Sequence, residues 1–407
     1  MGTSFGVGES EHHDSATAGR EAAERARAKL RGANAQIVIL FSTSRHDPEV
    51  LRDAVRNAFG GGVRVVGGYA VGIITNDLLS YDGFQVGLVA IHSDDVEFEL
   101  FLESGLAFDE EQVGRRLGEA IRARGPTESL NLMLFYDSVN RTNGRFQLNM
   151  ATPLLRGIRE TAPGLPPFVG AGLVGDMQCR ETHQWFDDRV EQQSVVAVGF
   201  RGNLQMDTIV MHGCKPSGAY HTITAAEGAT VFEIDGRPAL ELIAELLGDE
   251  EGRRRDYSEY SFFVTLGLNK GDEFAFDEEA YVNRLCLRAD PRRGGLVLFE
   301  PDLVEGSRVQ LMRRSLDFSY VRERTRTLLA RLEGRKALFA FYIDCAGRAG
   351  AYAGTEEEEA EELRRVLGPD VPLLGFFSGV ELAPIRGEVT PLDWTGVLTI
   401  FSVAADE

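Results

Sequence analysis

Apolar and polar positions follow one recurring order of strand, helix, strand and hairpin along this chain. Each occurrence starts with a continuous apolar run, typical of a strand buried on both faces, and continues with apolar residues at helical spacing. A second apolar run has glycine in it or just after it. The order occurs three times, which predicts an α/β protein of α+β character, with mixed β-sheets and flanking helices. The expected elements are 37–42, 48–59, 63–69 and 84–91 in the first unit, 130–136, 145–160, 167–172, 180–186 and 194–200 in the second, and 337–343, 355–367, 371–377, 380–384 and 396–401 in the third.

The chain between the second and third units has a different pattern, dominated by strands. A charged stretch at 248–255 interrupts it and predicts a linker. We therefore expect a flexible or helical N-terminal segment at 1–31, with its helix near 20–30, an N-terminal domain at 32–247 and a C-terminal domain at 256–407. In the intervening region we expect strands at 204–211, 219–224, 229–234, 262–268, 281–288, 295–299 and 308–311, a helix opening at 236–240 and another at 316–332.

Composition places the chain among globular, cytoplasmic proteins. Of the 407 residues 43% are hydrophobic, and the formal net charge of −20 repels nucleic acid and anionic membranes. No apolar run approaches the roughly 20 residues that cross a bilayer, and residues 1–31 lack the apolar core of a secretion signal. The four cysteines are widely separated, which favours reduced thiols over a disulfide framework. We expect no nucleic-acid and no membrane partner.

Motifs for catalysis are missing from the sequence. Residues 170–175 (GAGLVG) fit a dinucleotide-binding pattern, but the expected hairpin follows them instead of the helix that would bind a pyrophosphate. The histidines form neither HxH nor HExxH, and GxSxG and P-loop motifs are absent. We therefore expect a binding protein without catalytic residues and without a metal site. His212 and Cys214 form the one cluster that could meet a haem iron, with a structural turn at Gly213 as the alternative.

Several segments in the same order resemble the FIST sensory domain. The segments 169–176, 195–200, 212–218 and 233–241 are similar to its N-terminal part. Cys345 with Arg348, and the segment 374–384 (LGFFSGVELAP), are similar to its C-terminal part. The resemblance covers about 36–401. Relatives often have a histidine near the last strand, whereas this chain reads PLDWTG at 391–396.

The resemblance implies a sensory protein that binds a small ligand, such as an amino acid, in a cleft between its two parts. Because the sequence contains no kinase or other output segment, we expect it to signal through a separate partner, such as a histidine kinase. Whether the protein forms a homo-oligomer is left open. Arg180, Arg348 and Glu381 are expected to hold polar ligand groups, and Trp394 either stacks on the ligand or covers the core. The full set of expected ligand-binding residues is Gly172, Asp176, Arg180, Cys345, Arg348, Phe377, Glu381 and Trp394.

The resemblance also implies an alternative, since some stand-alone family members are haem proteins that sense nitric oxide. These members regulate a histidine kinase or a cyclic-di-GMP enzyme. The expected axial ligands of a haem in this chain are His212, Cys214, His183 and His221.

Overall fold

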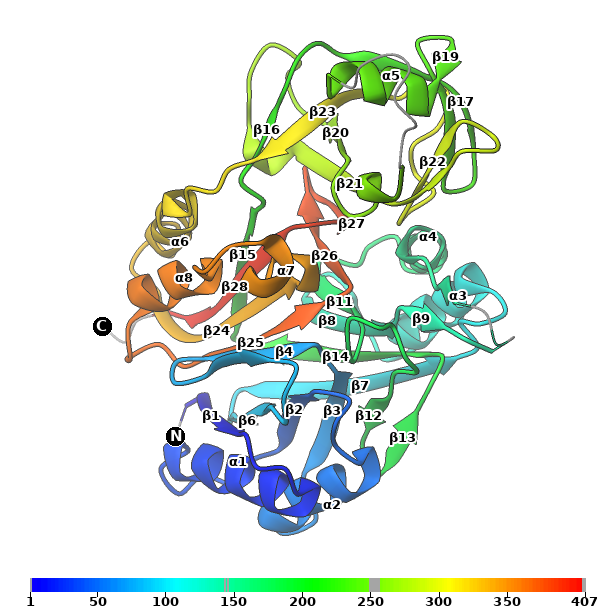
Figure 1. Ribbon diagram of the computed structural model, residues 1–407. Helices are drawn as coiled ribbons and strands as arrows, with labels where there is room; N and C mark the ends of the chain where they lie inside the picture. The colour runs from blue at the N-terminus through cyan, green and yellow to red at the C-terminus, as the bar shows by residue number, and fades with distance from the viewer. Residues whose placement is uncertain (1, 143, 145, 249–256, 405–407) are drawn as a thin grey trace.

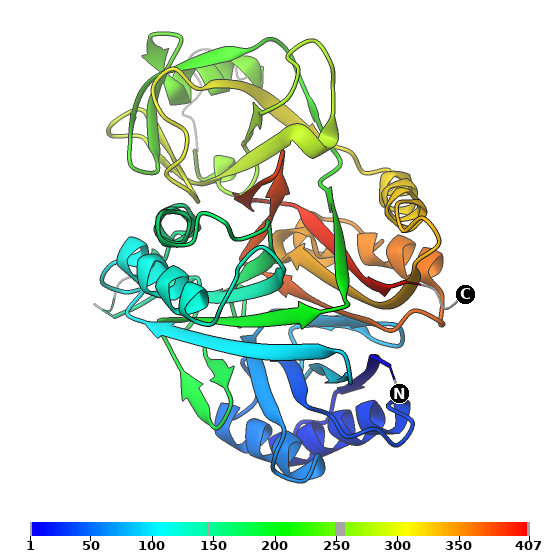
Figure 2. The ribbon, with the colours of Figure 1, turned by 180° about the vertical axis from the view of Figure 1, so that it is seen from behind.

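The structure is a computed structural model that describes residues 2–142, 144, 146–248 and 257–404. Three six-stranded mixed sheets surround a shared interior, helices cover their outer faces, and a small barrel stands at one end (Figure 1; Figure 2 from behind). The predicted α/β architecture, with mixed sheets, flanking helices and a unit repeated three times, is confirmed.

The first sheet is built mainly by the first unit. Its central strand runs parallel to one neighbour and antiparallel to the other, which requires a helical crossover on one side only. In spatial order its strands are β1 (Ser4–Ser10), β6 (Val86–His92), β2 (Ile37–Ser42), β3 (Arg64–Tyr69), β12 (Gln184–Phe186) and β13 (Arg189–Glu191), and its helices are α1 (Ser15–Lys29) and α2 (Pro48–Ala58).

The second and third sheets have the same arrangement. The second contains β27 (Glu388–Leu392), β26 (Val380–Ile385), β11 (Val169–Leu173), β8 (Leu130–Asp137), β14 (Ser194–Gly202) and β7 (Val96–Ser104), with helices α3 (Glu110–Ala123) and α4 (Ala151–Thr161) and the small pair β9 (Val139–Asn140) and β10 (Gln147–Leu148). The third contains β15 (Gln205–Met211), β28 (Gly396–Val403), β24 (Lys336–Cys345), β25 (Leu373–Ser378), β4 (Gly72–Thr75) and β5 (Leu79–Tyr81), with helices α6 (Ser319–Ala330), α7 (Gly350–Ala353) and α8 (Glu359–Leu367).

Each unit is larger than the sequence pattern indicated, because a further strand and helix precede it. Residues 1–31, expected to be flexible or helical, contribute β1 and α1 to the first sheet. Strand β1 pairs along its length with β6. Helix α1 lies so close to β1 that a Cβ at Gly8 would fall 2.0 Å from the carbonyl oxygen of Ala22. The glycine pattern of β1 therefore allows a helix to pack directly against a strand.

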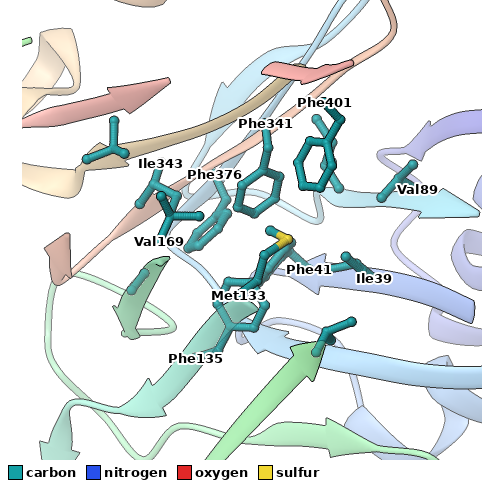
Figure 3. Packing of buried hydrophobic residues seen from close by; sticks show 14 of the residues in the cluster. Ile39, Phe41, Val89, Met133, Phe135, Val169, Phe341, Ile343, Phe376 and Phe401 are labelled. Atoms are coloured by element: carbon teal, nitrogen blue, oxygen red, sulfur yellow. The ribbon is translucent and has the colours of Figure 1, made fainter. Parts of the chain in front are cut away.

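The hairpin of each unit joins the sheet of another unit. Hairpin β4–β5 of the first unit pairs with β25 of the third, β12–β13 of the second with β3 of the first, and β26–β27 of the third with β11 of the second. This cyclic exchange makes every sheet depend on two units. The three inner faces bury one core in which Phe41 stacks on Phe376 at 4.0 Å and meets Phe135 edge to face (Figure 3).

The barrel is inserted into the third unit between β15 and α6. Pairing of β23 with both β17 and β20 closes six strands into a ring. Its strands lie on both sides of the predicted linker, whose residues 249–255 fall outside the described part of the chain. The insert consists of β16 (Cys214–Pro216), β17 (His221–Glu227), β18 (Thr230–Ile234), β19 (Arg237–Pro238), α5 (Ala239–Leu246), β20 (Thr265–Asn269), β21 (Tyr281–Asp290), β22 (Gly295–Leu298) and β23 (Arg308–Arg314).

Candidate ligand-binding site

A cavity of about 350 Å³ lies where the second and third sheets meet the barrel. The carboxyl ends of the parallel strands β8, β11, β24 and β25 converge there, and ligands of open α/β sheets bind outside the carboxyl ends of their strands. Most of the lining is apolar or aromatic, as in typical small-molecule sites. The lining residues are Ser138, Val139, Arg141, Phe146, Leu148, Val174, Asp176, Met177, Gln178, Cys179, Phe262, Leu285, Leu287, Phe299, Cys345, Ala346, Gly347, Ser378, Gly379, Val380, Asp393 and Trp394.

Three of the expected ligand-binding residues line this cavity: Asp176, Cys345 and Trp394. Cys345 ends β24 and is buried, and burial raises the pKa of its thiol. Trp394 lies in the turn before β28 with φ of +54°, an uncommon conformation for a large side chain. The Arg314 guanidinium lies 5.2 Å from the centroid of the Trp394 ring, so a cation covers part of the indole.

Asp176 and Arg180 form an ion pair at 2.7 Å beside the cavity. Asp176 Oδ2 also accepts from Ser44, and Oδ1 accepts from the backbone N–H of Gln178. Asp176 is shared between the apolar cavity and two polar cavities of about 420 and 430 Å³, and Arg180 lines both polar ones. Arg141 donates to the carbonyl oxygens of Gln178 and Cys179 and so joins the two loops that form the cavity mouth.

Arg348, Glu381 and Phe377 lie behind the cavity wall and do not line it. Glu381 is fully buried, accepts from Ser378 Oγ at 2.7 Å and from the Thr395 backbone N–H, and burial raises its pKa. Phe377 packs edge to face on Tyr81, which the hairpin of the first unit brings into the third sheet.

Gly172 has a packing role beneath the same wall. A Cβ at this position would fall 2.8 Å from the Tyr136 ring. The carbonyl oxygen of Gly172 accepts from the N–H of Gly379, which connects β11 to the turn after β25. As expected, the glycine-rich segment leads into hairpin β12–β13 and not into a helix.

Arg348 is the centre of a buried ion network. It donates to Asp344 at 2.8 Å, to Tyr320 and to Glu359, and Glu359 also pairs with Arg314 from the barrel exit. Its remaining donor, Nη1, reaches the carbonyl oxygens of His212 and Trp394 at 3.2 and 2.9 Å. Arg348 therefore holds the backbone of the cavity wall without facing the cavity.

The barrel side of the cavity contains Asp393. Its Oδ2 accepts from the Leu285 backbone N–H at 2.9 Å and lies 4.0 Å from Arg284 Nη1. Burial raises the pKa of Asp393 to about 6. Arg284 itself is buried and pairs with Asp302.

The four residues expected to ligate haem do not gather around a cavity. His212 is buried, with Nδ1 accepting from the Cys214 backbone N–H and Nε2 bonded to the Glu278 carbonyl oxygen, so both ring nitrogens are occupied. His221 pairs with Asp235 on the barrel, and His183 lies beside Tyr69 between the first and second units. None of the four lines the 350 Å³ cavity, so haem binding and nitric-oxide sensing are not supported. Within the described ranges, no three His, Cys, Asp or Glu side chains are grouped to hold a metal.

Sequence reasoning missed the aromatic and apolar walls and Asp393. Phe146 directly precedes β10, Phe299 follows β22, and Phe262 precedes β20, so elements far apart in the chain supply the cavity. The sequence pattern placed Phe146 in the expected helix at 145–160 and Phe262 in the expected strand at 262–268, so it gave no signal that these rings line a cavity. Across the residues with defined positions, no helix combines the length and apolarity needed to cross a membrane.

Comparison with known proteins identifies a family whose two domains together cover most of the chain. Residues 36–237 match the FIST N domain and residues 239–384 match the FIST C domain. An uncharacterized protein of Mycobacterium bovis is 29% identical over 240 residues, which are 57% of this chain and 60% of that protein. An uncharacterized protein of Mycobacterium tuberculosis is 27% identical over 256 residues, with 61% and 64% covered. The matched regions thus span less than two thirds of these relatives.

Two solved structures are distantly similar to the chain. A cyanuric acid hydrolase aligns with a TM-score of 0.37 and 9% identity, covering 99% of this chain and 100% of its own. A cyanuric acid hydrolase from A. caulinodans aligns with a TM-score of 0.26 and 10% identity, covering 49% and 72%. Scores this low support no conclusion about function.

Proposed function

The chain belongs to the FIST family of sensory domains, and from this premise we propose that it binds a small apolar ligand, such as an amino acid with an aromatic or aliphatic side chain, in the 350 Å³ cavity. We propose further that it acts as a binding protein and not as an enzyme, and that it passes the signal to a separate partner such as a histidine kinase. The observation that carries the proposal is the aromatic lining at the junction of two repeated units and the barrel.

The lining suits a ligand with an apolar body and polar ends. Trp394, Phe146, Phe262 and Phe299 present aromatic surface to the cavity. Among the described residues, Arg141 at the mouth donates hydrogen bonds only to carbonyl oxygens, and its guanidinium lies 5.8 Å from the centroid of the Phe146 ring. Part of the guanidinium therefore remains to meet a carboxylate. Because the cavity is bounded by both the sheets and the barrel, a bound ligand contacts both. Binding therefore favours one position of the barrel relative to the sheets.

Tryptophan fluorescence offers a direct test, because the chain has two tryptophans and only Trp394 lines the cavity. In a Trp185→Phe background, each of the twenty amino acids is titrated into the protein. The apolar amino acids are expected to change the Trp394 emission; binding of free tryptophan, which fluoresces itself, is measured by calorimetry instead. The same ligands are expected to raise the unfolding temperature, since they bind only the folded state. A flat response to all twenty in both measurements rejects the proposed ligand class.

Two adjacent phenylalanines provide a matched pair of variants. Phe262 lines the cavity and Phe263 does not, although their exposed fractions are similar at 55% and 61%. Phe262→Ala is expected to weaken binding about fivefold, since one aromatic contact contributes about 1 kcal/mol. Phe263→Ala is expected to leave affinity within about twofold. Equal effects of the two substitutions would place the ligand elsewhere.

A further inference from the structure

Asp393 has a carboxylate oxygen with no hydrogen-bond partner in the described part of the chain. The side chain lines the cavity and is 3% exposed. Leu285 N–H occupies Oδ2, whereas Oδ1 is buried without a partner. Asp176, the other carboxylate in the lining, has both oxygens occupied. An unpaired buried acceptor is costly to the folded protein and marks a place where a donor from outside would fit.

Charge around Asp393 also favours a cationic group. Arg284 is the nearest cation, but it is already paired with Asp302 and also faces Glu300. Glu300 accepts from the backbone N–H groups of Ala151 and Thr152, which are dipoles and not full charges. Arg284 is therefore shared by Asp302 and the buried Glu300 and Asp393, with Lys270 as a second cation near the partly exposed Asp302. Asp393 itself has no hydrogen bond to a cation in the described part of the chain, and Arg284 lies 4.0 Å from its other oxygen.

We propose that Asp393 determines the specificity of the cavity by accepting a hydrogen bond from a protonated amine of the ligand. This inference rests on the proposed function and names the group of the ligand that the cavity selects. The apolar body of the amine then lies against Trp394, the next residue in the chain, and against Phe299 and Leu285. The Trp394 ring adds an electron-rich face near the cation.

Three probes of similar shape test the proposal by calorimetry at pH 7.5: phenethylamine, 2-phenylethanol and 3-phenylpropionate. The unaltered chain is expected to bind phenethylamine at least tenfold more tightly than the other two. Asp393→Asn keeps an acceptor for the Leu285 N–H but removes the charge. This substitution is expected to lower the affinity for phenethylamine at least tenfold and to change the affinity for 2-phenylethanol by no more than about twofold. Asp290→Asn is the control, because Asp290 lies on the same barrel but outside the cavity lining. It is expected to leave the affinity for both probes unchanged.

The outcomes separate this inference from the proposed function. If 2-phenylethanol or 3-phenylpropionate binds as tightly as phenethylamine, or if Asp393→Asn binds the amine normally, the cavity binds ligands but Asp393 does not select an amine. If no probe binds and the twenty amino acids also give no response, both the inference and the proposed function fail. An unchanged unfolding temperature of Asp393→Asn would show that a lost amine preference does not come from a damaged fold.

Discussion

Replacement of Arg348 by methionine tests whether the buried ion network holds the cavity wall. Arg348 is 1% exposed and donates to Asp344, Glu359 and Tyr320 and to two backbone carbonyls. Methionine has a similar apolar stem but no charge. Because Glu359 keeps Arg314 as a partner, the carboxylate left without a described cation is Asp344.

The expected cost follows from leaving a charge buried. Removing one partner of a buried ion pair costs about 3–5 kcal/mol, far more than the pair itself contributes relative to apolar residues. Arg365→Met is the control, since Arg365 is 68% exposed and its partner Glu362 keeps a second cation, Arg322. Exposed pairs contribute about 0.2–1 kcal/mol, so the two substitutions should differ by at least about 2 kcal/mol.

The cost of Arg348→Met should depend on pH in a known direction. Burial raises the pKa of Asp344 to about 7, while the nearby Arg348 charge lowers it. A carboxyl group with a raised pKa contributes stability that is present below its unfolded pKa and lost as pH rises through the folded value. Without Arg348 the pKa of Asp344 rises further. The variant should therefore lose more stability between pH 6 and pH 8 than the unaltered chain does.

Urea denaturation followed by circular dichroism at pH 6 and pH 8 measures these differences. The double variant Asp344→Asn with Arg348→Met should recover part of the loss at pH 8, because the asparagine has no charge to bury. A loss of less than 1 kcal/mol, or an equal loss at both pH values, would show that the network does not stabilise the fold in the manner argued.

Three further predictions concern the core, the barrel and the thiols. Phe376→Ala should cost about 3–5 kcal/mol of unfolding free energy, because its ring lies in the core shared by the three sheets. Calorimetry should show one unfolding transition at a lower temperature, and separate transitions would contradict this. Glu300→Ala should cost about 2 kcal/mol in thermal unfolding, since Glu300 caps the N-terminus of α4 from the barrel; an unchanged midpoint would refute the cap. Iodoacetamide should modify Cys179 first, as the other three cysteines are buried, and peptide mass spectrometry would expose a different order.

The hydrophobic pattern predicted the helices and strands of the fold better than it predicted which strands pair with each other. The buried runs at 37–42 and 130–136 became β2 and β8 with nearly the expected bounds. The hairpins were also recognised, but alternation of apolar and polar residues does not say which sheet a hairpin joins. The exchange between units depends on contacts between residues that are far apart in the chain, from Gln184 with Gly68 to Phe376 with Ile73.

The candidate site was only partly predictable for a similar reason. Asp176 and Trp394 line the cavity, as a ligand-binding role requires. Arg348 and Glu381 carry charges that are typical of ligand contacts when exposed, yet both are buried with partners from distant elements. The sequence shows that Arg348 is charged but not that Glu359 pairs with it across the fold. A charged residue of a buried network therefore cannot be distinguished from a ligand contact by sequence alone.

The repeat explains the architecture, whereas the insertion explains the cavity. In the first and second units the first strand leads into its helix after four or five residues, between Ser10 and Ser15 and between Ser104 and Glu110. In the third unit the barrel occupies this connection. Both ends of the barrel, at His212 and Arg314, are tied to the network around Arg348 that also holds Trp394. The seam closed by the barrel is aromatic, while the seam near Ser44 that the barrel does not line is polar. The proposed ligand site therefore lies at one seam of a near-symmetric fold, the seam to which the insertion adds a wall.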